Sequence, residues 1–250
     1  MSGHSKWHNI RLRKGKQDAV RSKLFTKIAR EVIVAAREGG GSPESNLRLK
    51  LAVQKARDNS MPADNIKRAI QRGTGEVEGA SYEETSYEGY GPAGVAVLVS
   101  CLTDNRNRTV AELRNIFSKC GGNLGESGCV AWMFEQTGLI QIPGDNADED
   151  TVMMATMDAG AEDIRLEGDT VDVLCQPADL PHVRDAVSAA GIEYASAEVT
   201  MLPKSTVKIE DSKEANQILR LLDALEDNDD VQQVYANFDI LDELMQEAAA

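Results

Sequence analysis

The first 73 residues contain three stretches in which apolar residues recur every three or four positions. The clearest covers 17–38 and is carried by Val20, Leu24, Ile28, Val32 and Ala36. This period is that of an amphipathic helix, and Gly39 to Gly41 would end it. Further helices are predicted from Ser42 to about 59 and from Met61 to Gly73. Three helices with short joints predict a small helical domain that ends near residue 78.

Beyond residue 78 the pattern changes to an alternation of helices and strands. Gly94–Leu102 is a continuous apolar run, which is typical of a buried strand. Other strands are predicted at 130–134, 139–142, 161–166, 170–175, 194–201 and 231–238. Helices are predicted at 107–119, 148–159, 178–190 and 212–226. Strands and helices mixed in this way predict the α+β class.

The order of these elements suggests that one domain is inserted in another. Residues 145–203 contain helix, two strands, helix and strand, which is nearly a self-contained ferredoxin-like unit. Removing them leaves strand–helix–strand before and helix–strand after. We therefore predict an N-terminal three-helix domain followed by two α/β ferredoxin-like modules, the third domain inserted in the second. The predicted bounds are 1–78, then 79–136 plus 206–250, then 137–205.

Charge is distributed very unevenly along the chain. The formal net charge is −14, yet residues 1–72 hold 17 basic and 6 acidic side chains, a net +11. The remaining 178 residues hold 10 basic and 35 acidic side chains, a net −25. Such asymmetry indicates contact with nucleic acid or a membrane surface. A solvated basic face without any partner is a third interpretation.

The predicted nucleic-acid contacts lie mainly in an N-terminal arm, residues 1–16, and on the helix after it. Lysine and arginine neutralise phosphates, and Trp7 can stack on an exposed base, which is worth about 1–3 kcal/mol. Lys23, Lys27 and Arg30 are spaced to form one stripe on the helix. The predicted contact residues in these two segments are Lys6, Trp7, Arg11, Arg13, Lys14, Lys16, Arg21, Lys23, Lys27 and Arg30.

A second basic patch, Asn105 to Arg108, stands in an otherwise acidic region. Arg106 and Arg108 could bind phosphate or base edges through their planar guanidinium groups. The competing interpretation is a helix N-cap whose arginines pair with neighbouring acids. The second and third predicted helices also resemble a helix-turn-helix, with Lys67, Arg68, Gln71 and Arg72 on the recognition helix, although many helical bundles share this pattern.

Motifs that would indicate an enzyme or a cofactor are weak. Gly89 to Gly94 matches G-x-G-x-x-G, but an apolar strand follows it where a dinucleotide site needs a helix. His4 and His8 have no third metal ligand near them, and the four cysteines form no C-x-x-C pair. We predict no catalytic residues, no metal, no cofactor and no small-molecule substrate.

The apolar runs also bear on location. No run approaches the roughly 20 apolar residues that span a bilayer, and the N-terminus lacks the apolar core of a secretory signal. We therefore predict a cytoplasmic protein without a membrane partner.

Three long motifs resemble the YebC family: GHSKWHNIRLRKGKQDAVRSKLFTKIAREV, SYEGYGPAGVAVLV and LTDNRNRTVAELRNIFSKCGGNLGESGCVAWMF. The resemblance extends over essentially the whole chain. It implies three domains, no cofactor and no catalytic residues. Bacterial members are described as probable transcriptional regulators, which implies promoter DNA as partner. Mitochondrial relatives are translational activators, which implies ribosomal RNA or tRNA on the ribosome. Of the two, we expect a translation factor that acts on ribosomal RNA, with DNA-binding regulation as the alternative.

Overall fold

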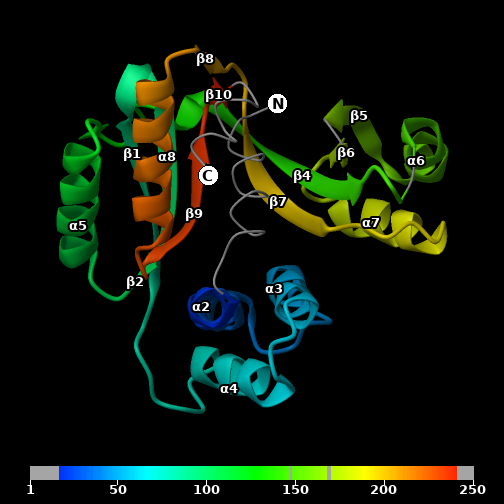
Figure 1. Cartoon of the computed structure of the whole chain (residues 1–250). Helices are drawn as coiled ribbons and strands as arrows, with labels where there is room; N and C mark the ends of the chain where they lie inside the picture. The colour runs from blue at the N-terminus through cyan, green and yellow to red at the C-terminus, as the bar shows by residue number, and fades with distance from the viewer. Residues whose placement is uncertain (1–16, 147, 168–169, 241–250) are drawn as a thin grey trace. The chain divides into compact units, whose positions relative to one another are not determined.

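The computed structural model describes residues 17–146, 148–167 and 170–240, with the side chains of 17–21 and 167 left aside. It has the predicted α+β fold: a three-helix region is followed by two four-stranded antiparallel sheets (Figure 1). Residues 133–204 form one compact unit, and the described residues before and after them form the other. The three-domain division and its predicted bounds stay a prediction.

The N-terminal region consists of α2 (Gln17–Gly39), α3 (Leu47–Asp58) and α4 (Ala63–Gly73). Helix α2 packs against both of the others. The helices bury mainly aliphatic side chains: Ile28, Val32, Ala36, Leu49, Ala52, Val53, Ile66 and Ala69. Because these residues recur at helical spacing, local periodicity was sufficient to predict all three helices.

Two residues set how these helices meet. The Asn46 side chain accepts a hydrogen bond from the Leu49 amide (3.0 Å) and donates to the Ala35 carbonyl (2.7 Å), so it caps α3 and ties it to α2. Gly73 allows α4 to approach α2 closely, since a Cβ there would lie 2.4 Å from the Ile33 carbonyl oxygen. The backbone contacts of α4 therefore depend on the absence of a side chain at this position.

The sheet of the larger unit has the order β3-β1-β2-β9. Its strands are β1 (Glu83–Tyr90), β2 (Ala96–Thr103), β3 (Asn123–Leu124) and β9 (Val231–Ala236). Helices α5 (Arg106–Lys119) and α8 (Ser212–Glu226) cover one face, where Val97 and Val99 of β2 share a core with Phe117 and Leu222. A short parallel pair, β8 (Val207–Ile209) and β10 (Phe238–Ile240), adjoins the same core.

Several local expectations differ from the structure. The predicted start of the second helix at Ser42 is wrong, because α3 begins at Leu47 and is capped by Asn46. Strand β1 was not predicted, because most of its side chains are polar and at least partly exposed. The predicted strand 130–134 is wrong: a 3-10 turn occupies Ala131–Met133, and the next strand begins at Phe134. Strands β3 and β8 were not predicted either, since two or three residues are too few to show a period.

Residues 133–204 contain, in chain order, a strand, a helix, two strands, a helix and a strand. These elements are β4 (Phe134–Pro143), α6 (Glu149–Thr156), β5 (Ala161–Glu167), β6 (Thr170–Cys175), α7 (Leu180–Ala189) and β7 (Ser196–Pro203). The sheet order β5-β6-β4-β7 is that of a ferredoxin-like fold. Val152 of α6 and Val183 of α7 pack with Ile140 and Val173 of the sheet.

Candidate nucleic-acid interface

The basic stripe of α2 contacts the C-terminal end of α8. The Nζ atom of Lys27 donates to the Glu226 carbonyl (2.7 Å), and that of Lys23 donates to the Asp227 carbonyl (3.3 Å). Arg30 donates to the carbonyl of Asp229. Carbonyl groups at a helix end lack intrahelical donors and carry partial negative charge. The stripe therefore has a structural role at α8, and its predicted contact with nucleic acid stays a prediction.

Asp230 is the buried centre of a polar cluster beside this helix end. Its carboxylate lies 2.6 Å from Nη2 of Arg108 and 3.1 Å from Nη1 of Arg30, and its side chain is 4% exposed. It also accepts hydrogen bonds from the hydroxyls of Thr109 (2.8 Å) and Thr103 (3.1 Å). Burial raises the pKa of Asp230, but the hydrogen bonds from Arg108 and Thr109 outweigh it, so the pKa is lowered. Asp230 is therefore ionised near neutral pH.

The patch at Asn105 to Arg108 forms a helix N-cap whose arginines pair with neighbouring acids. The Asn105 side chain accepts from the Arg108 amide (3.1 Å) and so caps α5. Arg106 pairs with Glu83 at 2.8 Å, and Arg108 pairs with both Asp104 and Asp230. The hydrogen bond that Arg108 donates to Asp230, more than any other contact, raises the pKa of Arg108. Both guanidinium groups thus have carboxylate partners, and no observation tests their predicted contact with nucleic acid.

Helices α3 and α4 carry exposed cations of a different kind. Five of them are exposed and form no ion pair with a described carboxylate: Lys50, Arg57, Lys67, Arg68 and Arg72. On α4 they lie opposite the buried Ile66 and Ala69, which face the helical core. Among the described residues, this is the group of N-terminal cations best placed to meet phosphate.

The predicted arm residues Lys6, Trp7, Arg11, Arg13, Lys14 and Lys16 lie outside the described residues. Arg21 belongs to α2, but its side chain is not described. Their predicted contact with nucleic acid therefore rests on the amino-acid sequence alone. Sequence analysis favours the α2 stripe over the α4 cations as a nucleic-acid contact, because the spacing of residues does not show which cations have a protein partner.

Glu88 organises a loop that the sequence did not single out. Its buried carboxylate accepts the amides of Gly128, Val130 and Ala131, each at 2.7 Å. Burial raises the pKa of Glu88, but these three hydrogen bonds lower it below its usual range. The loop ends at Trp132, which is 66% exposed and whose Nε1 donates to the Cys129 carbonyl. No local pattern distinguishes Glu88 from the other acids of β1.

Of the motifs that could suggest a cofactor or a metal, the glycine motif is described, whereas His4 and His8 lie outside the described residues. Gly89 to Gly94 lies in β1 and the turn before β2, and Gly94 has the positive φ of 74° that this turn requires. No described group of three or more potential ligands is placed to hold a metal. No described helix is long and apolar enough to cross a membrane.

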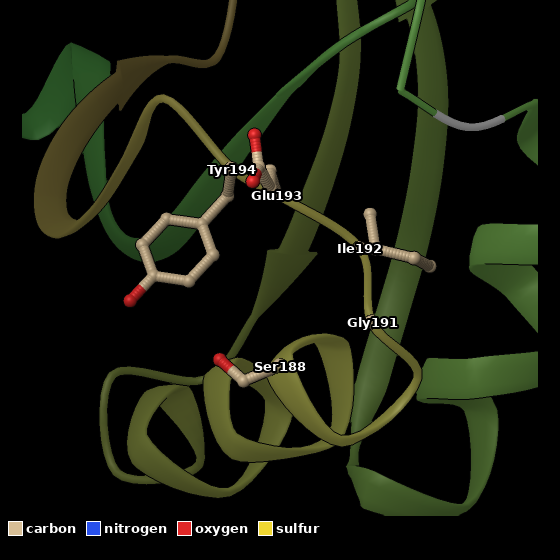
Figure 2. A pocket seen from close by; sticks show the side chains of 5 residues that line it. All are labelled: Ser188, Gly191, Ile192, Glu193 and Tyr194. Carbon is tan, nitrogen blue, oxygen red and sulfur yellow. The ribbon is translucent and has the colours of Figure 1, made fainter.

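A hollow of about 410 Å³ is lined by five residues of the 133–204 unit: Ser188, Gly191, Ile192, Glu193 and Tyr194. Figure 2 shows Ser188 and Tyr194 directed to the same side of the chain and Ile192 directed away from them. Glu193 is the one charged residue among the five. A lining without a cation does not suit a phosphate or another anion.

Family models match both parts of the chain. The model described as the TACO1/YebC protein N-terminal domain matches residues 5–76. The model described as the TACO1/YebC second and third domain matches residues 82–238. The chain belongs to the TACO1/YebC family.

Relatives in the TACO1/YebC family match along nearly their whole length. A protein of Persephonella marina is 54% identical over 250 residues, covering 100% of both chains. One of Pelotomaculum thermopropionicum is 55% identical over 244 residues, covering 97% of this chain and 100% of the relative. One of Geobacter sulfurreducens is 55% identical over 246 residues, covering 98% and 99%. Each is named a probable transcriptional regulatory protein.

A solved structure supports the same assignment. The crystal structure of a conserved hypothetical protein, Aq1575, from Aquifex aeolicus is 46% identical and has a TM-score of 0.82. The similarity covers 90% of this chain and 93% of that one. The exposed cations of α3 and α4 all lie within the residues matched by the N-terminal domain model of the TACO1/YebC family.

Proposed function

We propose that this protein is a non-enzymatic regulator of gene expression that binds nucleic acid through its N-terminal region. One observation carries the proposal: α3 and α4 present exposed cations without described carboxylate partners, in the one strongly basic part of an acidic chain. Clustered cations attract a polyanion and release its counterions on binding. The basic arm would add to this attraction.

Transcriptional regulation on DNA is the first candidate. Relatives at 54–55% identity are named probable transcriptional regulatory proteins. Helix α4 follows α3 after a short turn and carries Lys67, Arg68, Gln71 and Arg72. Arginine, lysine and glutamine are side chains that read base edges in the major groove, and a second helix after a short turn is the element that enters the groove in helix-turn-helix proteins.

Binding to RNA on the ribosome is the second candidate, and charge favours it. Residues 73–250 carry a net −25, which opposes lying along a long duplex. Trp7 offers a stacking surface that suits unpaired bases better than a closed duplex. A partner that touches the N-terminal region alone would avoid the acidic remainder of the chain.

A charge-reversal variant tests the interface. Lys67, Arg68 and Arg72 are each changed to Glu, and binding to duplex DNA and to ribosomal RNA is measured by anisotropy over a salt series. The control changes Lys208, Lys213 and Arg220 to Glu, because these cations are also exposed and the change in charge is the same. We expect the α4 variant to bind at least tenfold more weakly and with a shallower salt dependence. Equal affinities for the two variants would refute the α4 interface.

A competition distinguishes the two candidates. The protein is offered ribosomes and a promoter fragment together at physiological salt. If it ignores ribosomes and prefers one DNA sequence over random DNA by about a thousandfold or more, the range of specific binders, it is a transcriptional regulator. Co-sedimentation with ribosomes, without preference among DNA sequences, would instead support the second candidate.

A further inference from the structure

Helix α6 and the 3-10 turn that follows it, η3 (Met157–Ala159), expose methionines on the side that faces away from the core. Met153, Met154 and Met157 are 37%, 78% and 61% exposed. Met157 lies four positions after Met153 and three after Met154, so it neighbours both of them on the helical surface. The opposite side of the helix contributes the buried Val152 and Thr156. Helix α6 therefore has a second apolar surface in addition to the one that packs on the sheet.

Leu166 is a further exposed apolar side chain of this unit. It is 61% exposed and lies on β5, the outer strand of the sheet next to β6. Because Leu166 is two residues after Ile164, which packs on the core beneath the helices, both side chains lie on the helix-covered face. We define the methionine patch as Met153, Met154 and Met157. Scattered single apolar residues are common on surfaces, but a group of this kind indicates an interaction site.

The unit that carries the methionine patch is strongly acidic. Residues 133–204 hold 15 acidic and 3 basic side chains, a net −12. Two of the three cations are paired, Arg165 with Asp163 and Arg184 with Asp185. Glu149, Asp150 and Asp158 stand exposed on or beside α6, and no described cation forms an ion pair with them. The apolar patch therefore has an acidic border.

We propose that the methionine patch binds a basic, amphipathic helical segment of a partner protein. Apolar side chains of the segment would pack on the methionines, which are flexible and adapt to differently shaped partners. Its lysines and arginines would meet the carboxylates of Glu149, Asp150 and Asp158. An amphipathic helix presents both features at the same spacing.

Charge selects this partner over the other occupants of an apolar surface. Nucleic acid and anionic lipid would be repelled by a unit with a net charge of −12. Two copies that joined through this patch would bring the same acidic borders together. The methionine patch shares no residue with the cations of α3 and α4, so the inference does not depend on the proposed function.

The test uses the full chain and a labelled 18-residue peptide of leucine and lysine, with the leucines at helical spacing. Two comparison peptides are a scrambled version and one with glutamate in place of lysine. The variant M154Q/M157Q removes the apolar groups without adding charge. The control L47Q/V77Q removes two exposed apolar side chains of the other compact unit, which are 51% and 38% exposed.

We expect the leucine–lysine peptide to bind wild type and L47Q/V77Q alike, and M154Q/M157Q about tenfold more weakly. The scrambled and glutamate peptides should bind weakly to all three. Equal binding to M154Q/M157Q and wild type would overturn the proposal, because charge alone would then explain the affinity. It would also be overturned if M154Q/M157Q abolished self-association in sedimentation, or abolished binding to anionic vesicles, since the patch would then serve a second copy or a membrane.

Discussion

Nη1 of Arg30 lies 3.1 Å from Oδ1 of Asp230, a residue 200 positions further along the chain. The Arg30 side chain is 14% exposed and that of Asp230 is 4% exposed. The same carboxylate also holds Arg108, so α2, α5 and the start of β9 meet at one buried acid. Breaking a buried ion pair leaves an uncompensated charge in the interior.

Replacing Asp230 with Ala should therefore lower the free energy of unfolding by about 3–5 kcal/mol. The control is Asp229→Ala, which removes the neighbouring exposed carboxylate and should change stability by less than about 0.5 kcal/mol. Urea denaturation followed by circular dichroism measures both. Similar midpoints for the two variants would show that the Asp230 cluster contributes little.

Acid should weaken the fold through Asp230 and Glu88. Both pKa values are lower in the folded chain than their ordinary values, which are about 3.9 for Asp and 4.3 for Glu. Stabilisation by such groups is complete above the unfolded-state pKa and is lost as the pH falls through the folded-state pKa. We expect the melting temperature to fall below about pH 4. Glu88→Gln should flatten part of that decline, whereas an unchanged pH profile would contradict the role of Glu88.

Gly73→Ala should destabilise the N-terminal helices by about 1–3 kcal/mol. The added Cβ would lie 2.4 Å from the Ile33 carbonyl oxygen and 2.6 Å from the Ala36 Cβ, so α4 has to move away from α2. Gly79→Ala is the matched control, because the nearest atom to its Cβ lies at an ordinary 3.5 Å. Thermal unfolding compares the two. A G73A melting curve that coincides with that of G79A would refute the close approach.

The two tryptophans allow the arm to be observed separately. The chain has Trp7 in the arm and Trp132 at the end of the loop held by Glu88. In Trp132→Phe, the remaining fluorescence comes from Trp7, and stacking on bases should quench it when nucleic acid is added. In Trp7→Phe, fluorescence from Trp132 should change little. Changing Arg11, Arg13, Lys14 and Lys16 to Glu should abolish the Trp7 quenching, and quenching that persists would argue against the arm.

Residues 133–204 should be removable. The Lys204 amide donates to the Met133 carbonyl at 2.8 Å, so the two ends of this unit lie side by side. A short Gly/Ser linker from Trp132 to Ser205 should leave a remainder that unfolds cooperatively, because β9 pairs with β2 without a strand from the removed unit. A deletion variant that lacks a cooperative transition would contradict the insertion as a separate folding unit.

Helix and strand periodicity in the sequence was sufficient to predict the α+β class, the three N-terminal helices and the strand–helix alternation of residues 133–204. These features depend on neighbours a few positions apart. Strand β1 was not predicted, because its polar residues, such as Glu83 and Thr85, form a strand only through pairing with β2. The 3-10 turn at Ala131 likewise depends on Glu88, more than 40 positions earlier.

The sequence by itself determined the concentration of positive charge in residues 1–72, because charge is a property of composition. Only the tertiary structure decided how the described cations are used. Nothing in the sequence shows that Lys23, Lys27 and Arg30 have protein partners, yet they bind carbonyls at the end of α8 and in the turn after it, about 200 positions away. On α3 and α4, Arg48 and Lys55 have carboxylate partners, whereas no described carboxylate forms an ion pair with Lys50, Arg57, Lys67, Arg68 or Arg72. A helical period shows which side chains share a face, but chain folding alone brings a distant helix end to that face.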